Sequence, residues 1–203
     1  MKKRDPFQHA LAALMASAAD GRFAWGEPLV VTALAQELGL SPTPVREALA
    51  RLSGEGLIDH RPGRGYFASS PSVEDVVDLL EYHRRLVHWA LDLIEQATIR
   101  PPIGPIDGAS GERVFVAIVR ASERSVVVRG HWRTTLQLRP IRKLQVRMSA
   151  SDAEWIRRVQ PLLLACDISA IRREVDLHHQ DSTRVASAVV NEMRRAAESI
   201  VQI

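Results

Sequence analysis

The segment from Leu34 to Phe67, LAQELGLSPTPVREALARLSGEGLIDHRPGRGYF, constrains the fold more than any other part of the chain. It contains two short helical patterns separated by Gly39, and the second opens with Ser41 and two prolines, which the first turn of a helix tolerates. A hairpin pattern with the basic, glycine-rich tip Pro62-Gly63-Arg64-Gly65 follows. This order predicts a winged helix-turn-helix, which places one helix in the major groove of DNA.

Composition limits the class of protein further. The 203 residues include 27 basic and 24 acidic side chains, so the net charge of +3 favours one local basic patch over a generally basic surface. Cys166 is the only cysteine, which excludes an internal disulfide and indicates a reducing compartment. The N-terminus has the basic start and Ala/Leu-rich run of a signal peptide, but Asp5 and His9 interrupt it and an amphipathic helix fits as well. We interpret it as a folded first helix and expect a cytoplasmic protein with no membrane partner.

The predicted fold is mainly α, with a winged helix-turn-helix domain over residues 1–70 and an all-helical bundle over 71–203. Ser72 and Asp75 form a capping-box pattern for a helix that runs to about Ala97. The stretch from Arg100 to Gly111 holds three prolines and three glycines, which predicts a loop. The other expected helices are Pro6–Ala19, Val31–Gly39, Ser41 to Gly54, Glu112–Ser122, Ser125–Leu138, Ser151–Ala165 and one from Ile168. Val126-Val127-Val128 also fits a strand, although no partner strand is evident.

The third helix carries the candidate DNA-reading side chains. Its buried stripe is Val45, Ala48, Leu49 and Leu52, so Thr43 and Arg46 lie on the opposite face near the N-terminal end, which points at bases and phosphates in this motif. The predicted DNA-binding residues are Thr43, Arg46, Arg51, Arg61, Gly63, Arg64 and Gly65. The alternative is a solvated helix face on which Glu47 pairs with Arg51.

The pattern S-P-T-P-V-R-E-A-L, followed by E-G-L-I and R-P-G-R-G, resembles the DNA-binding domain of the GntR family of bacterial transcription regulators. The family pattern is V-S-R-T-P-V-R-E-A-L, then E-G-L and P-x-R-G. The resemblance covers the first third of the chain and implies a dimeric repressor on a short palindrome, with DNA contacts at Thr43, Arg46, Gly63 and Arg64. Pro42 replaces the arginine that usually follows the serine, so one common contact is absent.

The helical half resembles the effector domain of the FadR-type branch, in shortened form (FCD-like). In that branch the bundle often holds a metal through one aspartate and three histidines and binds a small carboxylate. Carried over, the aspartate falls on Glu112, two histidine positions fall on Val116 and on Trp155 or Ile156, and His178 (or His179) matches the last. Two candidate ligands, Glu112 and His178, are fewer than the three or more donors that such metals need, so we expect no metal cofactor.

A reduced effector pocket remains a hypothesis. Arg84, His88 and His131 are the weak candidates to line a carboxylate pocket, whereas Trp89, Trp132 and Trp155 are expected in the core. The chain has no Walker loop, no G-x-S-x-G and no H-E-x-x-H, so we predict that it is not an enzyme unless residues 72–203 hold an unrecognised site.

Two functions follow. The first is a dimeric, ligand-responsive regulator, most simply a repressor, that binds a palindromic double-stranded DNA operator and a small carboxylate effector. The alternative is a DNA-binding protein whose helical half only dimerises or docks a partner.

Overall fold

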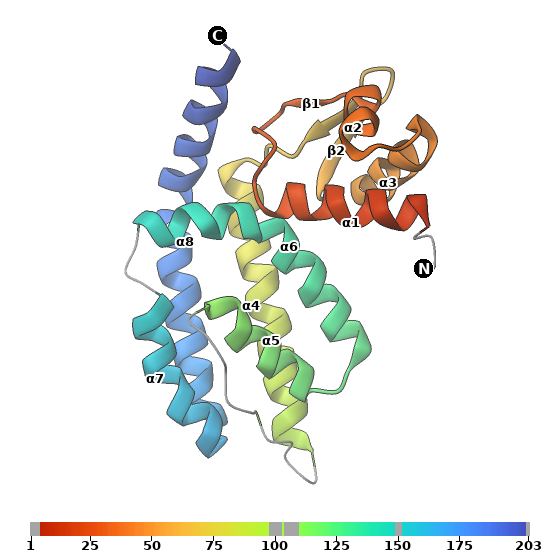
Figure 1. Cartoon of the computed structure of the whole chain (residues 1–203). Coiled ribbons are helices and arrows are strands. Elements are labelled where there is room, and N and C mark those ends of the chain that lie inside the picture. Colours follow the sequence, from red (N-terminus) through yellow and green to blue (C-terminus); the bar gives the residue numbers. More distant parts are fainter. Residues whose placement is uncertain (1–4, 98–102, 104–109, 149–151, 202–203) are drawn as a thin grey trace. The chain divides into compact units, whose positions relative to one another are not determined.

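The computed structural model describes residues 5–97, 103, 110–148 and 152–201 (Figure 1). Contacts divide the chain into two compact units, one made of the residues up to Pro71 with those from Val190 onward, and one of Ser72–Val189. The last turns of the C-terminal helix therefore group with the first unit. The prediction of a mainly α chain with an N-terminal winged helix-turn-helix is confirmed.

Three helices form the N-terminal domain: α1 (Pro6–Ala19), α2 (Val31–Leu38) and α3 (Pro42–Gly54). The helix α1 begins where predicted, because Pro6 suits a first turn and the Asp5 side chain accepts a hydrogen bond of 3.1 Å from the Phe7 N–H. The helix α2 ends at Gly39, whose φ of 64° is the left-handed conformation that glycine adopts readily. The predicted stripe of α3 is fully buried and holds that helix against the domain core.

A small antiparallel sheet completes this domain. Its strands are β1 (Pro28–Leu29), β2 (Ile58–Arg61) and β3 (Gly65–Ala68), in the order β1-β3-β2. The predicted hairpin is β2–β3, with Ile58 opposite Ala68 and Arg61 opposite Gly65. The strand β1 was not predicted, and its two residues pair with Tyr66 and Phe67.

The second unit contains the helices α4 (Val73–Gln96), α5 (Gly111–Ala121), α6 (Ser125–Met148), α7 (Asp152–Ala165) and most of α8 (Ile168–Val201), whose last turns group with the first unit. The capping box at Ser72 and Asp75 is present, with Ser72 N–H donating to the Asp75 carboxylate at 2.8 Å. Figure 1 shows the long helices α4 and α8 running beside each other. Their apolar stripes meet α5 and α7 in a core that includes Leu91, Phe115 and Ile171.

Three expectations about the second unit need correction. The helix α6 does not end near Leu138 but continues through Pro140 to Met148, because Leu138 and Ile141 are buried on either side and packing outweighs the lost backbone hydrogen bond. Residues 126–128 are helical and form no strand. Trp155 is in the core as expected, whereas Trp89 and Trp132 are 46% and 47% exposed because they lie opposite the buried stripes of α4 and α6.

Candidate functional sites

The N-terminal end of α3 presents an open polar surface. Thr43 and Arg46 are exposed on it, and in the described part of the chain Arg46 forms no ion pair. Arg51, one turn further on, is paired instead with Glu55 at 2.7 Å. The helix therefore leaves Arg46 able to donate to a base edge or a phosphate, while Arg51 must first leave its carboxylate. The alternative pairing of Arg51 with Glu47 is not the one observed.

Two prolines change how the start of α3 can bind an anion. Ser41 occupies the N-cap position with extended backbone (φ −75°, ψ 159°), yet its side chain makes no capping hydrogen bond. The N–H groups that a cap would bind belong to the second and third helical residues, and the third is Pro44, which has none. Pro42 removes a further donor, so the free backbone donor in this first turn is the Thr43 N–H. The predicted phosphate site at this terminus therefore depends on Thr43 and side-chain hydroxyls.

The wing carries the remaining predicted contacts. Gly63 and Gly65 have φ values of 72° and 95°, which fit a tight turn that L side chains adopt with strain. The turn is closed by Arg64 N–H donating to the Arg61 carbonyl at 2.9 Å. Arg64 is exposed at the tip, whereas the Arg61 guanidinium lies 4.2 Å from the centre of the Phe67 ring. Arg64 is thus free to meet DNA, and Arg61 is held by a cation–π contact.

Comparison with known proteins decides the class of this domain. Residues 6–67 match the model of the bacterial regulatory proteins of the gntR family. The N-terminal domain is therefore similar to that family. The match spans the helix-turn-helix and wing just described and ends at Phe67, within β3.

Solved structures show that the chain shares its fold with other proteins over most of its length. The structure of E. coli McbR/YncC has a TM-score of 0.67 at 17% identity and covers 91% of this chain and 98% of its own. A transcriptional regulator GntR from Rhodococcus sp. RHA1 has a TM-score of 0.67 at 19% identity, covering 89% of this chain and 96% of its own. No curated protein matches the sequence. None of the helices in the described ranges is long and apolar enough to cross a membrane.

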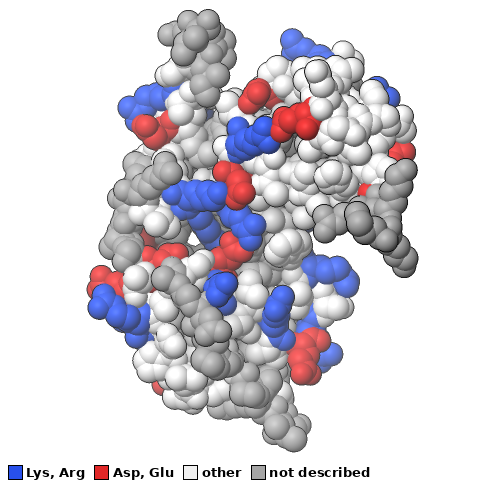
Figure 2. Space-filling model, in the orientation of Figure 1, with Lys and Arg blue, Asp and Glu red and all other residues white. Residues whose placement is uncertain are grey.

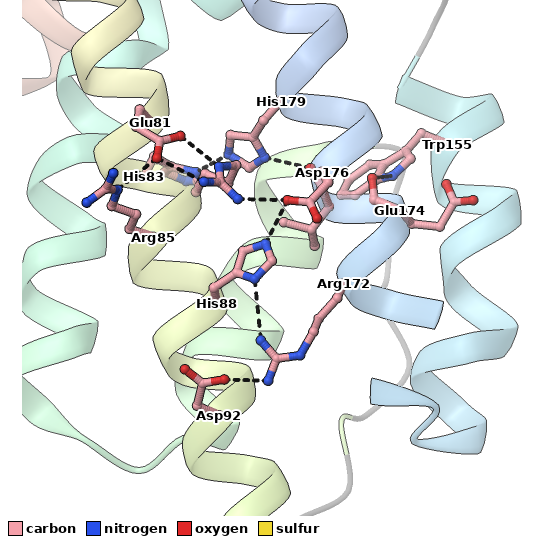
Figure 3. Close-up of polar contacts among 12 residues, drawn as sticks. Glu81, His83, Arg85, His88, Asp92, Trp155, Arg172, Glu174, Asp176 and His179 are labelled. Atoms are coloured by element: carbon pink, nitrogen blue, oxygen red, sulfur yellow. Dashed lines mark hydrogen bonds and ion pairs between the residues drawn. The ribbon is translucent and has the colours of Figure 1, made fainter. Parts of the chain in front are cut away.

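The candidate effector residues of the helical domain lie in two places. Arg84 and His88 on α4 both contact Asp176 on α8, at 2.9 and 2.8 Å, and Arg84 also binds Glu81 (Figure 3). Arg172 continues this network from His88 to Asp92. Hydrogen bonds from two arginines, Arg84 first and Arg85 second, lower the pKa of the Glu81 carboxyl to about 2. Arg84 and His88 are thus engaged in joining two helices.

His131, the third candidate, belongs to a histidine cluster that the sequence analysis did not find: His83, His131, His178 and His179. The ring centres of His83 lie 4.7 Å from those of His131 and 5.1 Å from those of His179. Burial is the main cause that lowers the pKa of His131 to about 4 and of His179 to about 3. Burial also puts the pKa of His83 well below its usual value. His83, His131 and His179 are therefore neutral near pH 7.

The helical spacing of the sequence contains a signal that predicts this histidine cluster. His83 lies three residues after Leu80 and four before Val87, and His179 lies four after Val175, so both fall on the buried stripes of their helices. His131 has the same relation to Val127. A histidine that replaces an apolar residue in such a stripe predicts a buried imidazole, and three of them on different helices predict a meeting point.

A pocket of about 270 Å³ opens beside the cluster. Its lining comes from four helices and includes Glu112, Phe115, Arg142, Asp152, Trp155 and His178. The weak metal candidates Glu112 and His178 are thus brought to one pocket. Neither Arg84, His88 nor His131 is part of its described lining.

The metal that the FadR-type branch implies does not fit these side chains. Both Glu112 oxygens accept from Arg139, at 3.0 and 2.5 Å, so a metal would have to displace a bidentate ion pair. A second guanidinium, that of Arg142, lines the same pocket and would repel a divalent cation. In the described part of the chain, no three His, Cys, Asp or Glu side chains are placed so as to hold a metal ion.

Proposed function

We propose that this GntR-family protein is a ligand-responsive repressor that binds a palindromic operator as a dimer. The observation that carries the proposal is the free, exposed Arg46 beside Thr43 at the open end of α3, with Arg64 at the tip of the wing. A helix end and a wing are the two parts through which such a domain contacts base edges and phosphates. The regulator would act in the cytoplasm, where its DNA lies.

The charge distribution supports local recognition by these residues. On the face drawn in Figure 2, basic and acidic side chains lie intermingled, in keeping with a net charge of only +3. A protein of this kind gains little affinity from its general field, so its DNA binding depends on a few placed arginines. We include Thr43, Arg46, Gly63, Arg64 and Gly65 in the proposed contact surface, with Arg51 and Arg61 as secondary members.

Two features of the helical domain support the response to a ligand and the dimer. The pocket next to the histidine cluster is lined by four helices of the second unit, which we propose to be an FCD-like bundle, and a small carboxylate is the effector that we propose for it. Tyr82 and Trp89 on α4 are 51% and 46% exposed, and Val126 on α6, a helix that packs on α4, is 55% exposed. Large exposed apolar side chains on adjoining helices are typical of a subunit interface, and a second copy of the chain is the proposed occupant.

The alternative, a helical half that only dimerises or docks a partner, has one observation in its favour. Two of the candidate effector residues, Arg84 and His88, are engaged by Asp176 and so give rigidity to the α4–α8 pair. Under this alternative, the pocket has no ligand and DNA affinity does not respond to small molecules. A thermal-shift screen with small carboxylates separates the two functions, because ligand binding raises the melting temperature of the protein.

Footprinting on the promoter region of its own gene tests the DNA-binding proposal. We expect protection of two half-sites about one helical turn apart, or a multiple of this, if a dimer reads a palindrome. Arg46→Ala should remove the protection, while sedimentation should report a dimer for both proteins. Protection that is unchanged in Arg46→Ala, or a single unpaired half-site, would contradict the proposal.

A further inference from the structure

A chain of hydrogen bonds fixes the guanidinium of Arg142 in the interior of the helical domain. His179 Nδ1 lies 2.7 Å from the Val175 carbonyl and must donate to it, so its Nε2 accepts. His83 Nδ1 then donates to that nitrogen at 2.9 Å (Figure 3), which leaves His83 Nε2 to accept from Arg142 Nη2 at 3.2 Å. Each bond requires a neutral histidine, in agreement with the lowered pKa values of His83 and His179.

The other two donor atoms of Arg142 have no partner. Nε and Nη1 are buried and make no hydrogen bond in the described structure, although the residue as a whole is only partly covered. Burial lowers the pKa of Arg142 to about 10, so the side chain remains charged near pH 7. A buried, charged donor without an acceptor is unfavourable, so the site lacks a group that an anion would supply.

The nearby carboxylates do not fill this role because other groups engage them. Glu112 is bound by Arg139 through both oxygens. Asp152 accepts from the Gly111 N–H at 2.9 Å and faces His178 at 3.6 Å. Arg142 therefore lines the pocket as a held cation, which Glu112 and Asp152 attract through their charge but to whose Nε and Nη1 they make no hydrogen bond.

We propose that Arg142 takes the place of a metal ion in this domain and binds a small carboxylate in the pocket directly, without any divalent cation. This inference rests on the proposed sensing function, and it adds which side chain of that pocket binds the ligand. A guanidinium is permanently charged and donates hydrogen bonds to carboxylates, so it supplies the two properties that a metal would give such a ligand. Binding should consequently be insensitive to chelators.

The remaining lining indicates the size and second feature of the ligand. About 270 Å³ lies below the roughly 300–1,000 Å³ of sites for drug-sized molecules, so a compact acid fits. His178 lines the same pocket, and its buried Nδ1 makes no hydrogen bond in the described structure. It can serve a second polar group, such as a hydroxyl or another carboxyl, while Phe115 and Trp155 cover the carbon skeleton.

The test uses the full chain, dialysed against EDTA, with malonate, succinate, citrate and inorganic phosphate as probes in calorimetry and thermal shift. We expect at least one carboxylate to bind with the same affinity with EDTA and after addition of Zn²⁺. Arg142→Gln should weaken that binding at least tenfold, and Arg142→Lys, which keeps the charge, by less. Arg173→Gln on the exposed face of α8 is the matched control and should bind as the wild type does.

Several results would overturn the inference. These are binding that EDTA abolishes and Zn²⁺ restores, binding unaffected in a folded Arg142→Gln, preference for phosphate over every carboxylate, and absence of binding by all four probes. The chelator comparison uses only the wild type, so it decides the matter even if Arg142→Gln does not fold. If a carboxylate binds at Arg142 but leaves operator affinity unchanged, the inference stands and the sensing function fails. If operator affinity responds to a carboxylate that binds through a metal, the sensing function stands and the inference about Arg142 fails.

Discussion

The DNA-reading surface and the polar interior of the helical domain use arginine in opposite ways. At the end of α3 and in the wing, Arg46 and Arg64 are exposed, close in sequence and supported by a local turn geometry. In the helical domain, Arg142 is hydrogen-bonded to His83, which lies 59 residues away in the sequence. His83 is bonded in turn to His179, which lies 96 residues from it. The first arrangement is local and solvated, whereas the second exists only when α4, α6 and α8 pack. The comparison predicts that damage to the second site costs stability and damage to the first costs DNA affinity.

Phe115→Ala should produce the largest effect. The ring is 1% exposed and contacts His83, Trp155 and His178 at centre distances of 4.8, 5.0 and 5.2 Å. Removing it should lower the free energy of unfolding by about 3–5 kcal/mol, because both its buried surface and its packing are lost. Urea denaturation measures this, with Phe115→Leu as the control that retains most of the volume. A loss below about 1 kcal/mol would mean that the cluster is not part of the core.

The second-largest effect should come from mild acid, which should lower the free energy of unfolding through the buried histidines. His131 and His179 are neutral when folded, with pKa values of about 4 and about 3, but take up protons near pH 6.5 when unfolded. The unfolded state therefore binds more protons below pH 6.5, and the free energy of unfolding should fall by up to about 1.4 kcal/mol per histidine per pH unit.

Urea denaturation at pH 7.5, 6.5 and 5.5 measures this loss. The fall should begin near pH 6.5 and continue toward pH 4. His131→Gln removes one titrating group and should reduce the slope between pH 6.5 and 5.5. An equal slope in the variant would show that His131 is not held neutral by the fold. Added salt should alter the slope little, because buried groups are screened less than exposed ones.

Arg46→Ala should lower operator affinity by about 1–3 kcal/mol, or roughly 5- to 150-fold, with no change in the melting temperature. Arg51→Ala sharpens the comparison within the same helix, because its Glu55 partner at 2.7 Å must be displaced before it can meet DNA. We expect a smaller loss for Arg51 in a gel-shift titration at fixed salt. Equal losses would show that the ion pair is broken in the complex.

The smallest expected effects are changes in stability when Gly63 or Gly54, which have different backbone conformations, is replaced by alanine. Gly63 has a φ of 72°, so Gly63→Ala should destabilise the wing by about 1 kcal/mol through backbone strain even though nothing lies within 4 Å of the added carbon. Gly54 is helical with the same free space, so Gly54→Ala should stabilise by about 0.5–1 kcal/mol. Thermal unfolding of the two variants should give shifts of opposite sign, and shifts of one sign would contradict the conformations observed.

The DNA-binding domain was predictable because its signals are local. Pro6, Gly39, the paired prolines and the wing glycines each define a turn or a helix end within a few residues, and the structure confirms α1, α2 and the hairpin from them. The two-residue strand β1 was missed because its register is set by β3, which lies 39 residues away in the case of Pro28 and Phe67. The capping box of α4 is another local signal that was confirmed.

The sequence by itself determined the mainly α class, the winged domain and which face of α3 meets solvent, because periodicity and turn chemistry act over a few residues. Only the tertiary structure decided that Glu112 pairs with Arg139, that Arg84 and His88 join two helices, and that His83 contacts Arg142. Those pairings depend on how α4, α6 and α8 pack, and no local pattern encodes the distance between side chains on different helices.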